Sequence, residues 1–192
     1  MDTLLGVAVG IGLAAACGFR VFVPLLVMGG AARLGWYEPS AGFIWMATTP
    51  ALLAFAVATA LEVAAAHVPF LDHALDVVAA PLAVAAGALT MAGALGEASP
   101  LLRWSFALIA GGGTAGLFHG LNGLLRAGST VTTAGLGNPL FASLETAGAF
   151  TLAAIAVLVP VVGLLLTVAM VTVIWRLVRR MRAGGRAGVR TA

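Results

Sequence analysis

The sequence predicts an all-α fold, a polytopic transmembrane helical bundle of five or, alternatively, six spans, and two observations carry this prediction. Of the 192 residues, 61% are hydrophobic and only 9% are charged, whereas soluble domains carry about 25% charged residues. Several apolar runs also reach the roughly 18 residues that mark a membrane span. A chain of this length leaves no room for a separate soluble catalytic domain.

The first and last apolar segments need a closer look than the others. Arg20 and Pro24 interrupt the first segment. The last segment is longer than a ~30 Å hydrocarbon core at 1.5 Å per residue. It therefore forms either one long helix kinked at Pro160 or a hairpin that turns at residues 160–163. The five segments cover residues 3–30, 50–66, 77–96, 101–125 and 140–175.

The charge distribution favours five spans with the N-terminus outside and the C-terminus in the cytoplasm. With a single final span, Arg33 and Arg103 both lie on the cytoplasmic side, as the positive-inside rule requires. Two half-helices in the first segment would undo this count. Residues 1–180 are expected to form a single transmembrane domain, and residues 181–192 a basic, disordered cytoplasmic tail.

The basic residues are all arginines and gather near the C-terminal end. We expect them to anchor the topology and to touch anionic lipid head groups. No aromatic or base-reading module accompanies them, so nucleic acid is not an expected partner. The expected partners are the lipid bilayer and either another copy of the chain or another membrane protein. The clustered arginines are Arg176, Arg179, Arg180, Arg182, Arg186 and Arg190.

A glycine ridge follows the fourth segment. Gly112, Gly116 and Gly120 stand four residues apart, and such a pattern lets helix backbones approach closely in a membrane. The ridge serves either packing inside the bundle or a seam between two copies of the chain.

Two pairs of segments share a rough plan that suggests an inverted repeat. Each pair has a Gly-rich helix, then a helix start at Thr49-Pro50 or Asn138-Pro139, and then a helix that bears Glu62 or Glu145. With one span between them, the pairs have opposite orientation, which is the layout of many transporters.

Several polar groups fall inside apolar segments, where an ionisable group costs about 2.5–3.5 kcal/mol. Arg20 lies either at membrane depth or at a helix end from which it reaches the interface. Glu62 and Glu145 are its natural partners, and such a pair either locks the bundle or acts as a proton- or ion-coupled gate. His119 and Asn122 either cross-link helices or line a path for a solute or proton.

Hydroxyl groups precede the last segment, in a loop expected over residues 127–139. Thr132 and Thr133 lie in this loop, and Asn138 stands at the start of the next helix. Free amides at that helix start suit anions or polar head groups. The alternative is an ordinary extracellular loop.

An acidic connection joins the second and third segments. If Pro69 opens the third helix, Asp72 and Asp76 stand one turn apart on one face. Together with Glu62 and either His67 or His73 they form a candidate site for a divalent cation. The same acids could instead cap free amides and favour the helix dipole.

The combination of these residues resembles a bacterial membrane family named domain of unknown function 4126. The resemblance covers almost the whole chain to about Arg180 and implies a membrane fold in a bacterial cytoplasmic (inner) membrane. In the family a second acid usually follows the later glutamate, where this chain has Thr146. An Ala-Asp-Lys-Ile-Pro run is also common where this chain has residues 65–69. The resemblance rests on Gly18-Phe19-Arg20 with Pro24, Glu62, Pro69, Asp72-His73, Asp76, the run from Ser129 to Pro139, and Glu145.

The leading functional hypothesis is a small transporter or channel-like protein that moves an ion or small polar solute past the polar groups of the bundle. A second is a structural or accessory subunit that binds lipid or a membrane partner through its glycine ridges. A third is a metal-dependent enzyme acting on a lipid head group. The sequence has no nucleophile motif, phosphate-binding loop or dinucleotide fingerprint, so enzyme activity is not favoured.

Overall fold

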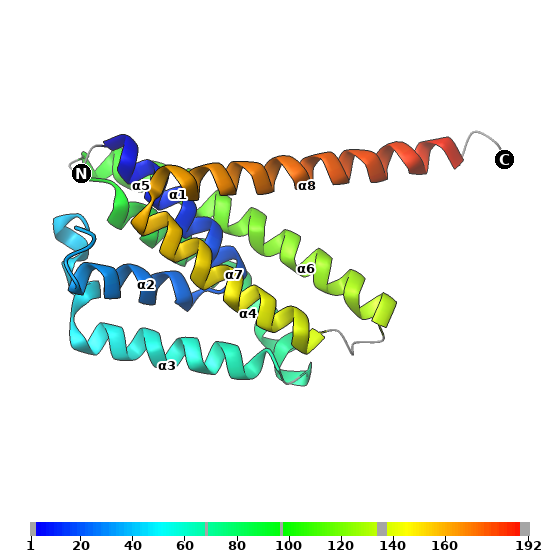
Figure 1. Ribbon diagram of the computed structural model, residues 1–192, viewed down its shortest axis with the longest axis horizontal. Helices are drawn as coiled ribbons and strands as arrows, with labels where there is room; N and C mark the ends of the chain where they lie inside the picture. The colour runs from blue at the N-terminus through cyan, green and yellow to red at the C-terminus, as the bar shows by residue number, and fades with distance from the viewer. Residues whose placement is uncertain (1–2, 68, 97, 134–137, 189–192) are drawn as a thin grey trace.

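The computed structural model describes residues 3–67, 69–96, 98–133 and 138–188, and this part of the chain is all-helical (Figure 1). Side chains are described for fewer residues, not for 69–77, 130–133, 138, 174, 177–178 or 180–188. The elements are α1 (Thr3–Phe19), α2 (Phe22–Arg33), η1 (Ala41–Ala47), α3 (Thr49–Ala65), α4 (Pro69–Ala94), α5 (Pro100–Phe106), η2 (Ala107–Gly112), α6 (Gly113–Thr133), α7 (Asn138–Leu158) and α8 (Pro160–Gly188).

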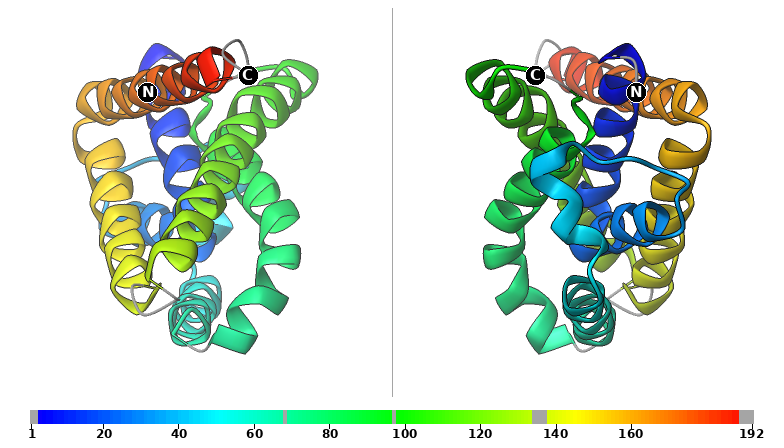
Figure 2. Two further views of the ribbon diagram at one scale, coloured as in Figure 1. Left: turned by 90° about the vertical axis from the view of Figure 1, so that its right-hand side faces the viewer. Right: turned by 90° about the vertical axis from the view of Figure 1, so that its left-hand side faces the viewer.

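Helix α1 is the centre of the bundle. Figure 2 shows it enclosed by α4, α6 and α7, with α8 across one end. Small residues on α1 make this possible: a side chain at Gly6 would meet the carbonyl of Ala94 in α4, and one at Gly12 would meet Ala156 in α7. Close backbone approach of this kind is how helices associate where lipid gives no hydrophobic drive.

The first apolar segment forms two helices, not one span. Helix α1 ends at Phe19, and α2 begins at Phe22 and runs back toward the side where α1 starts (Figure 1). With 17 and 12 residues, neither reaches the roughly 20 residues of a straight span. The five-span count is therefore not confirmed, because it assumed one helix here.

The last apolar segment turns at Pro160, so the hairpin alternative holds and the favoured single final span is wrong. Helix α8 folds back from α7 (Figure 1). The turn is tight enough that a side chain at Gly163 would meet the Cα atom of Ala156 at 2.7 Å. Only glycine leaves room for this approach.

By length and composition, two helices of the described residues are able to cross a membrane, and a third is possible if a bent pair counts as one span. They are the continuous helix Pro100–Ser129 and the helix Pro139–Leu158, with η1 and α3 as the pair bent by 65°. The two halves of the predicted inverted repeat differ in their first helix. In the first half this helix is broken at Arg20, whereas in the second half the helix Pro100–Ser129 is continuous.

One local prediction is wrong: helix α6 continues to Thr133, so residues 127–133 are helical and not a loop. Helix α3 starts at Thr49, as its Thr49-Pro50 start predicts, and Thr48 is its N-cap residue. Helix α8 is described as far as Gly188, and the disordered cytoplasmic tail over residues 181–192 stays a prediction.

The glycine ridge packs inside the bundle over part of its length. Side chains at Gly112 and Gly116 would approach Val84 of α4 at 3.1 and 3.2 Å. Gly120 has open space beside it. A closer contact, not part of the predicted ridge, lies between Gly111 of the π-helical turn η2 and Gly87 of α4.

Candidate functional site

Arg20 occupies the break between α1 and α2 and points into the bundle. The residue is 4% exposed, so its guanidinium is buried among the helices of the bundle. Its Nη2 atom lies 3.4 Å from Oε2 of Glu145 and donates a 3.0 Å hydrogen bond to the carbonyl of Ala142. Its Nε donates a 3.1 Å hydrogen bond to the hydroxyl of Thr146. One face of α7 thus receives the guanidinium in the forked geometry typical of arginine.

Glu145 is shared by two arginines. Nη2 of Arg126, from α6, lies 2.7 Å from the same Oε2 atom that Arg20 approaches. The Glu145 side chain is 3% exposed, and its Oε1 atom is buried without a hydrogen bond from any described residue. Asn122 of α6 lies beside this carboxylate. A buried carboxylate needs such partners, because its desolvation otherwise costs several kcal/mol.

Glu62 has a different role from the one predicted. It binds backbone amides at the start of α2: Oε1 accepts from the amide of Val21 at 2.7 Å, and Oε2 accepts from the amide of Phe22 at 3.1 Å. A carboxylate at this position satisfies two free N–H groups and complements the positive end of the helix dipole. The guanidinium of Arg20 binds Glu145 instead, so Glu62 is not its direct partner.

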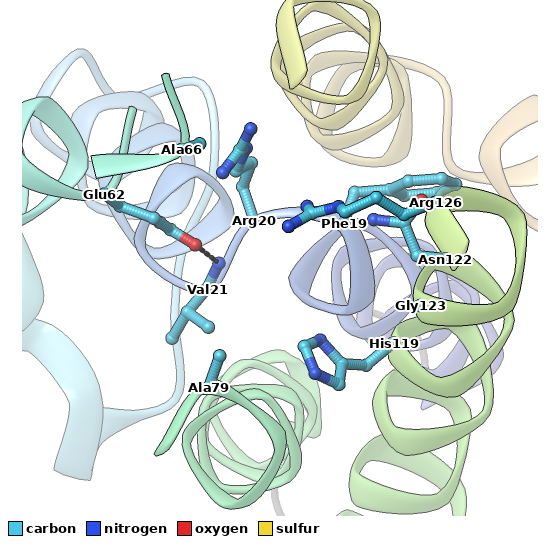
Figure 3. A pocket seen from close by; sticks show the side chains of 10 residues that line it. All are labelled: Phe19, Arg20, Val21, Glu62, Ala66, Ala79, His119, Asn122, Gly123 and Arg126. Carbon is cyan, nitrogen blue, oxygen red and sulfur yellow. Dashed lines mark hydrogen bonds between the residues drawn. The ribbon is translucent and has the colours of Figure 1, made fainter. Parts of the chain in front are cut away.

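These groups surround a polar cavity of about 50 Å³, which is room for a few water molecules. Figure 3 shows Glu62 of α3 on one side of the cavity, with His119, Asn122 and Arg126 of α6 on the other. Arg20 lines it at the helix break. If all are ionised, the two arginines and two glutamates balance in charge.

The structure brings together five residues that the sequence singled out. Arg20, Glu62, His119 and Asn122 line the cavity, and Glu145 lies directly behind Arg20. They come from the α1–α2 break and from three further helices, so no short motif could contain them. Other candidates lie where the structure does not describe side chains, namely Asp72, His73, Asp76, Thr132, Thr133 and Asn138.

The divalent-cation site is not tested by the described residues. Helix α4 does begin at Pro69, the condition for placing Asp72 and Asp76 on one face. Among the side chains that the structure describes, no three His, Cys, Asp or Glu residues gather closely enough to hold a metal ion. His67, near the same connection, bonds instead to the carbonyl of Val63 and to Ser143 of α7, at 2.8 and 3.4 Å.

Arg126 and Thr146 are site residues that the sequence analysis missed. Arg126 follows His119 by seven residues and Asn122 by four, so the three share one face of a helix. This spacing was the sequence signal from which Arg126 could have been predicted as a site residue. The hydroxyl of Thr146 accepts a hydrogen bond from Arg20 and donates one to the carbonyl of Ala142 at 2.8 Å.

Comparison with known proteins identifies the family. A family model described as Domain of unknown function (DUF4126) matches residues 7–180. This is most of the chain, so the chain belongs to that family, as the resemblance predicted. No curated protein and no solved structure matches it.

Proposed function

We propose that this member of the DUF4126 family is a small transporter or channel-like membrane protein that moves an ion or small polar solute through the cavity at the α1–α2 break. One observation carries the proposal: Arg20, Glu62, His119, Asn122 and Arg126 together line a cavity of about 50 Å³ within an apolar bundle. A broken helix whose ends face a polar site is a recurrent arrangement in secondary transporters.

The arrangement of partners favours transport over a purely structural role. A structural lock needs only the Arg20–Glu145–Arg126 cluster, whose members bind one another. Glu62 also has a structural role as the cap of α2, but His119 and Asn122 add polar atoms to the cavity wall beyond that cluster. Polar groups at membrane depth are costly unless a cavity or partner solvates them. In the proposed function, the arginines hold Glu145 while the other three residues line the path.

Flux through proteoliposomes tests the proposal. We expect the wild-type chain to carry at least one of protons, sodium, potassium and chloride, each followed with a dye inside the vesicles. Arg20→Ala and Glu145→Gln should each abolish that flux. Glu38→Gln is the matched control, because it removes a carboxylate at an exposed position in the loop after α2. Flux no greater than in empty vesicles, or flux unchanged in both site variants, would overturn the proposal in favour of a structural or accessory subunit.

We also propose a cytoplasmic (inner) membrane location with the C-terminal end of α8 in the cytoplasm. Arg176 and Arg179 stand near the end of its apolar part, and the positive-inside rule places such residues on the cytoplasmic side. Arg179 also lies 4.3 Å above the ring of Trp175, a combination typical of the membrane interface. Two reporters fused after residue 192 test this topology. A fluorescent protein that folds only in the cytoplasm should fluoresce, and a phosphatase that is active only after export should be inactive. Phosphatase activity would contradict the topology.

A further inference from the structure

A second, larger hollow lies beside the polar cavity, between α3 and α4. Its volume is about 580 Å³, and every residue that lines it is apolar except Glu62. Leu61 of α3 and Val78 and Leu82 of α4 stand at its walls and are exposed. These exposed apolar side chains are of the kind that membrane helices present to lipid, and the groove lies open beside them.

The groove and the polar cavity are neighbours that share three lining residues. Val21, Glu62 and Ala79 belong to both. The apolar groove therefore ends at the carboxylate of Glu62, and the other polar groups of the cavity lie beyond that carboxylate. This sequence of surfaces, first apolar and then polar, matches an amphiphile lying with its chain in the groove.

We propose that the groove binds an acyl chain of a membrane phospholipid whose primary ammonium head group reaches Glu62. Bilayer lipid is the occupant because the groove lies open beside apolar side chains of the kind that face lipid. Glu62 lies in the last turn of α3, the second half of the bent pair that is a candidate span, and the end of such a span would lie near the lipid head groups. The groove and Glu62 therefore match the positions of the acyl chain and the head group of a phospholipid.

The chemistry of Glu62 selects the head group. Each of its oxygens accepts one backbone amide, and an ionised carboxylate has about four lone-pair sites. Lone pairs therefore remain for a donor that approaches from the groove. A primary ammonium carries three N–H donors and a positive charge, so phosphatidylethanolamine fits; the trimethylammonium of phosphatidylcholine has no N–H to donate.

This site does not require that the cavity conduct anything, since a lipid can bind in the groove as a structural component. Its test therefore uses thermal stability and not flux, and the two proposals fail separately. The purified full chain in detergent is mixed with phosphatidylethanolamine, phosphatidylcholine or phosphatidylglycerol that all carry the same acyl chains. We expect phosphatidylethanolamine to raise Tm most, by mass action on the folded state.

Two variants separate the head-group contact from the groove. Glu62→Gln should remove the advantage of phosphatidylethanolamine over phosphatidylcholine. Ala58→Phe places a ring in the groove and should remove stabilisation by all three lipids, while Ala60→Phe adds the same ring on α3 outside the groove lining and should leave it intact. Equal stabilisation by the three lipids, a preference for phosphatidylglycerol, or a normal lipid response of Ala58→Phe would overturn the proposal.

Discussion

The chain turns back twice within an apolar segment, between α1 and α2 and between α7 and α8, and the two turns are built from different residues (Figure 1). The first gathers Arg20, Glu62 and the Glu145–Arg126 pair around a polar cavity. The second has Gly163 against the fully buried Ala156. No charged residue occurs anywhere between residues 151 and 175.

This difference shows that charged residues are not needed to reverse the chain direction in this bundle. The second turn demonstrates that proline, glycine and alanine alone reverse a helix in this bundle. The four ionisable groups at the first turn are costly to bury until they are paired. Glu62 serves the reversal itself, because it caps α2. For the cluster of Arg20, Glu145 and Arg126, the proposed solute binding at the cavity is one requirement beyond chain reversal.

The largest effect is expected from Glu145→Ala. It leaves Arg20 and Arg126 without their shared carboxylate, and removing one partner of a buried ion pair costs about 3–5 kcal/mol. The free energy of unfolding, measured by denaturant titration in detergent micelles, should fall by this amount. Glu38→Gln, at an exposed position, should leave it unchanged. A loss under about 1 kcal/mol in Glu145→Ala would mean that the pair is solvated, and the first turn would then differ from the second only in composition.

A smaller effect, different at the two turns, is expected from glycine-to-alanine changes. At Gly18 a new Cβ atom would lie 2.7 Å from the carbonyl of Ala115 in α6, and at Gly12 it would lie 2.6 Å from Cβ of Ala156. Overpacking of this kind costs about 1–3 kcal/mol, so both variants should lower the midpoint of unfolding. Gly113→Ala, which meets open space, is the control.

Only one of these two variants should also change the cavity. Gly18→Ala pushes against the backbone of α6 at His119, and α6 carries the polar wall of the cavity, whereas Gly12 lies against α7 near the second turn. Flux in proteoliposomes should therefore fall in Gly18→Ala and persist in Gly12→Ala once equal amounts of folded protein are compared. Equal loss in both would remove the distinction between a functional turn and a structural one.

A still smaller effect is expected from Glu62→Ala. The change removes the acceptor for the amides of Val21 and Phe22, and loss of an N-terminal cap costs about 0.5–2 kcal/mol. Hydrogen exchange of these two amides, followed by mass spectrometry, should become faster than in the wild type while exchange in α8 stays the same. Unchanged protection at Val21 and Phe22 would show that the cap is not formed in the membrane protein.

The polar residues at the first turn were largely predictable from the sequence for an energetic reason, although the turn itself was not. A buried arginine requires an acid nearby and few acids are available, so the sequence predicts Glu62 and Glu145 as its partners. The structure shows that Glu145 is the one that pairs with Arg20. The polar face of α6 was also accessible, because His119, Asn122 and Arg126 repeat at helical spacing.

The second turn and the role of Glu62 could not be predicted in the same way. Hydropathy is equally high on both sides of Pro160, so composition does not distinguish a kinked helix from a hairpin. What decides is the contact of Gly163 with Ala156, which depends on three-dimensional packing. Likewise, Glu62 binds amides that become available only because the chain breaks after α1.

The smallest effect is expected from Pro160→Ala, which tests whether the second turn depends on its proline. Proline is favoured at the first position of a helix, where its missing N–H is not needed, and Pro160 begins α8. Alanine tolerates the same backbone, so the loss should stay under about 1 kcal/mol, chiefly through greater freedom of the unfolded chain. Gly163 remains against Ala156 in this variant, and that contact holds the hairpin. The distance between spin labels placed at exposed positions on α7 and α8, Leu144 and Val173, should therefore be unchanged. A longer distance would mean that α7 and α8 straighten into one helix, and that proline, not packing, makes the turn.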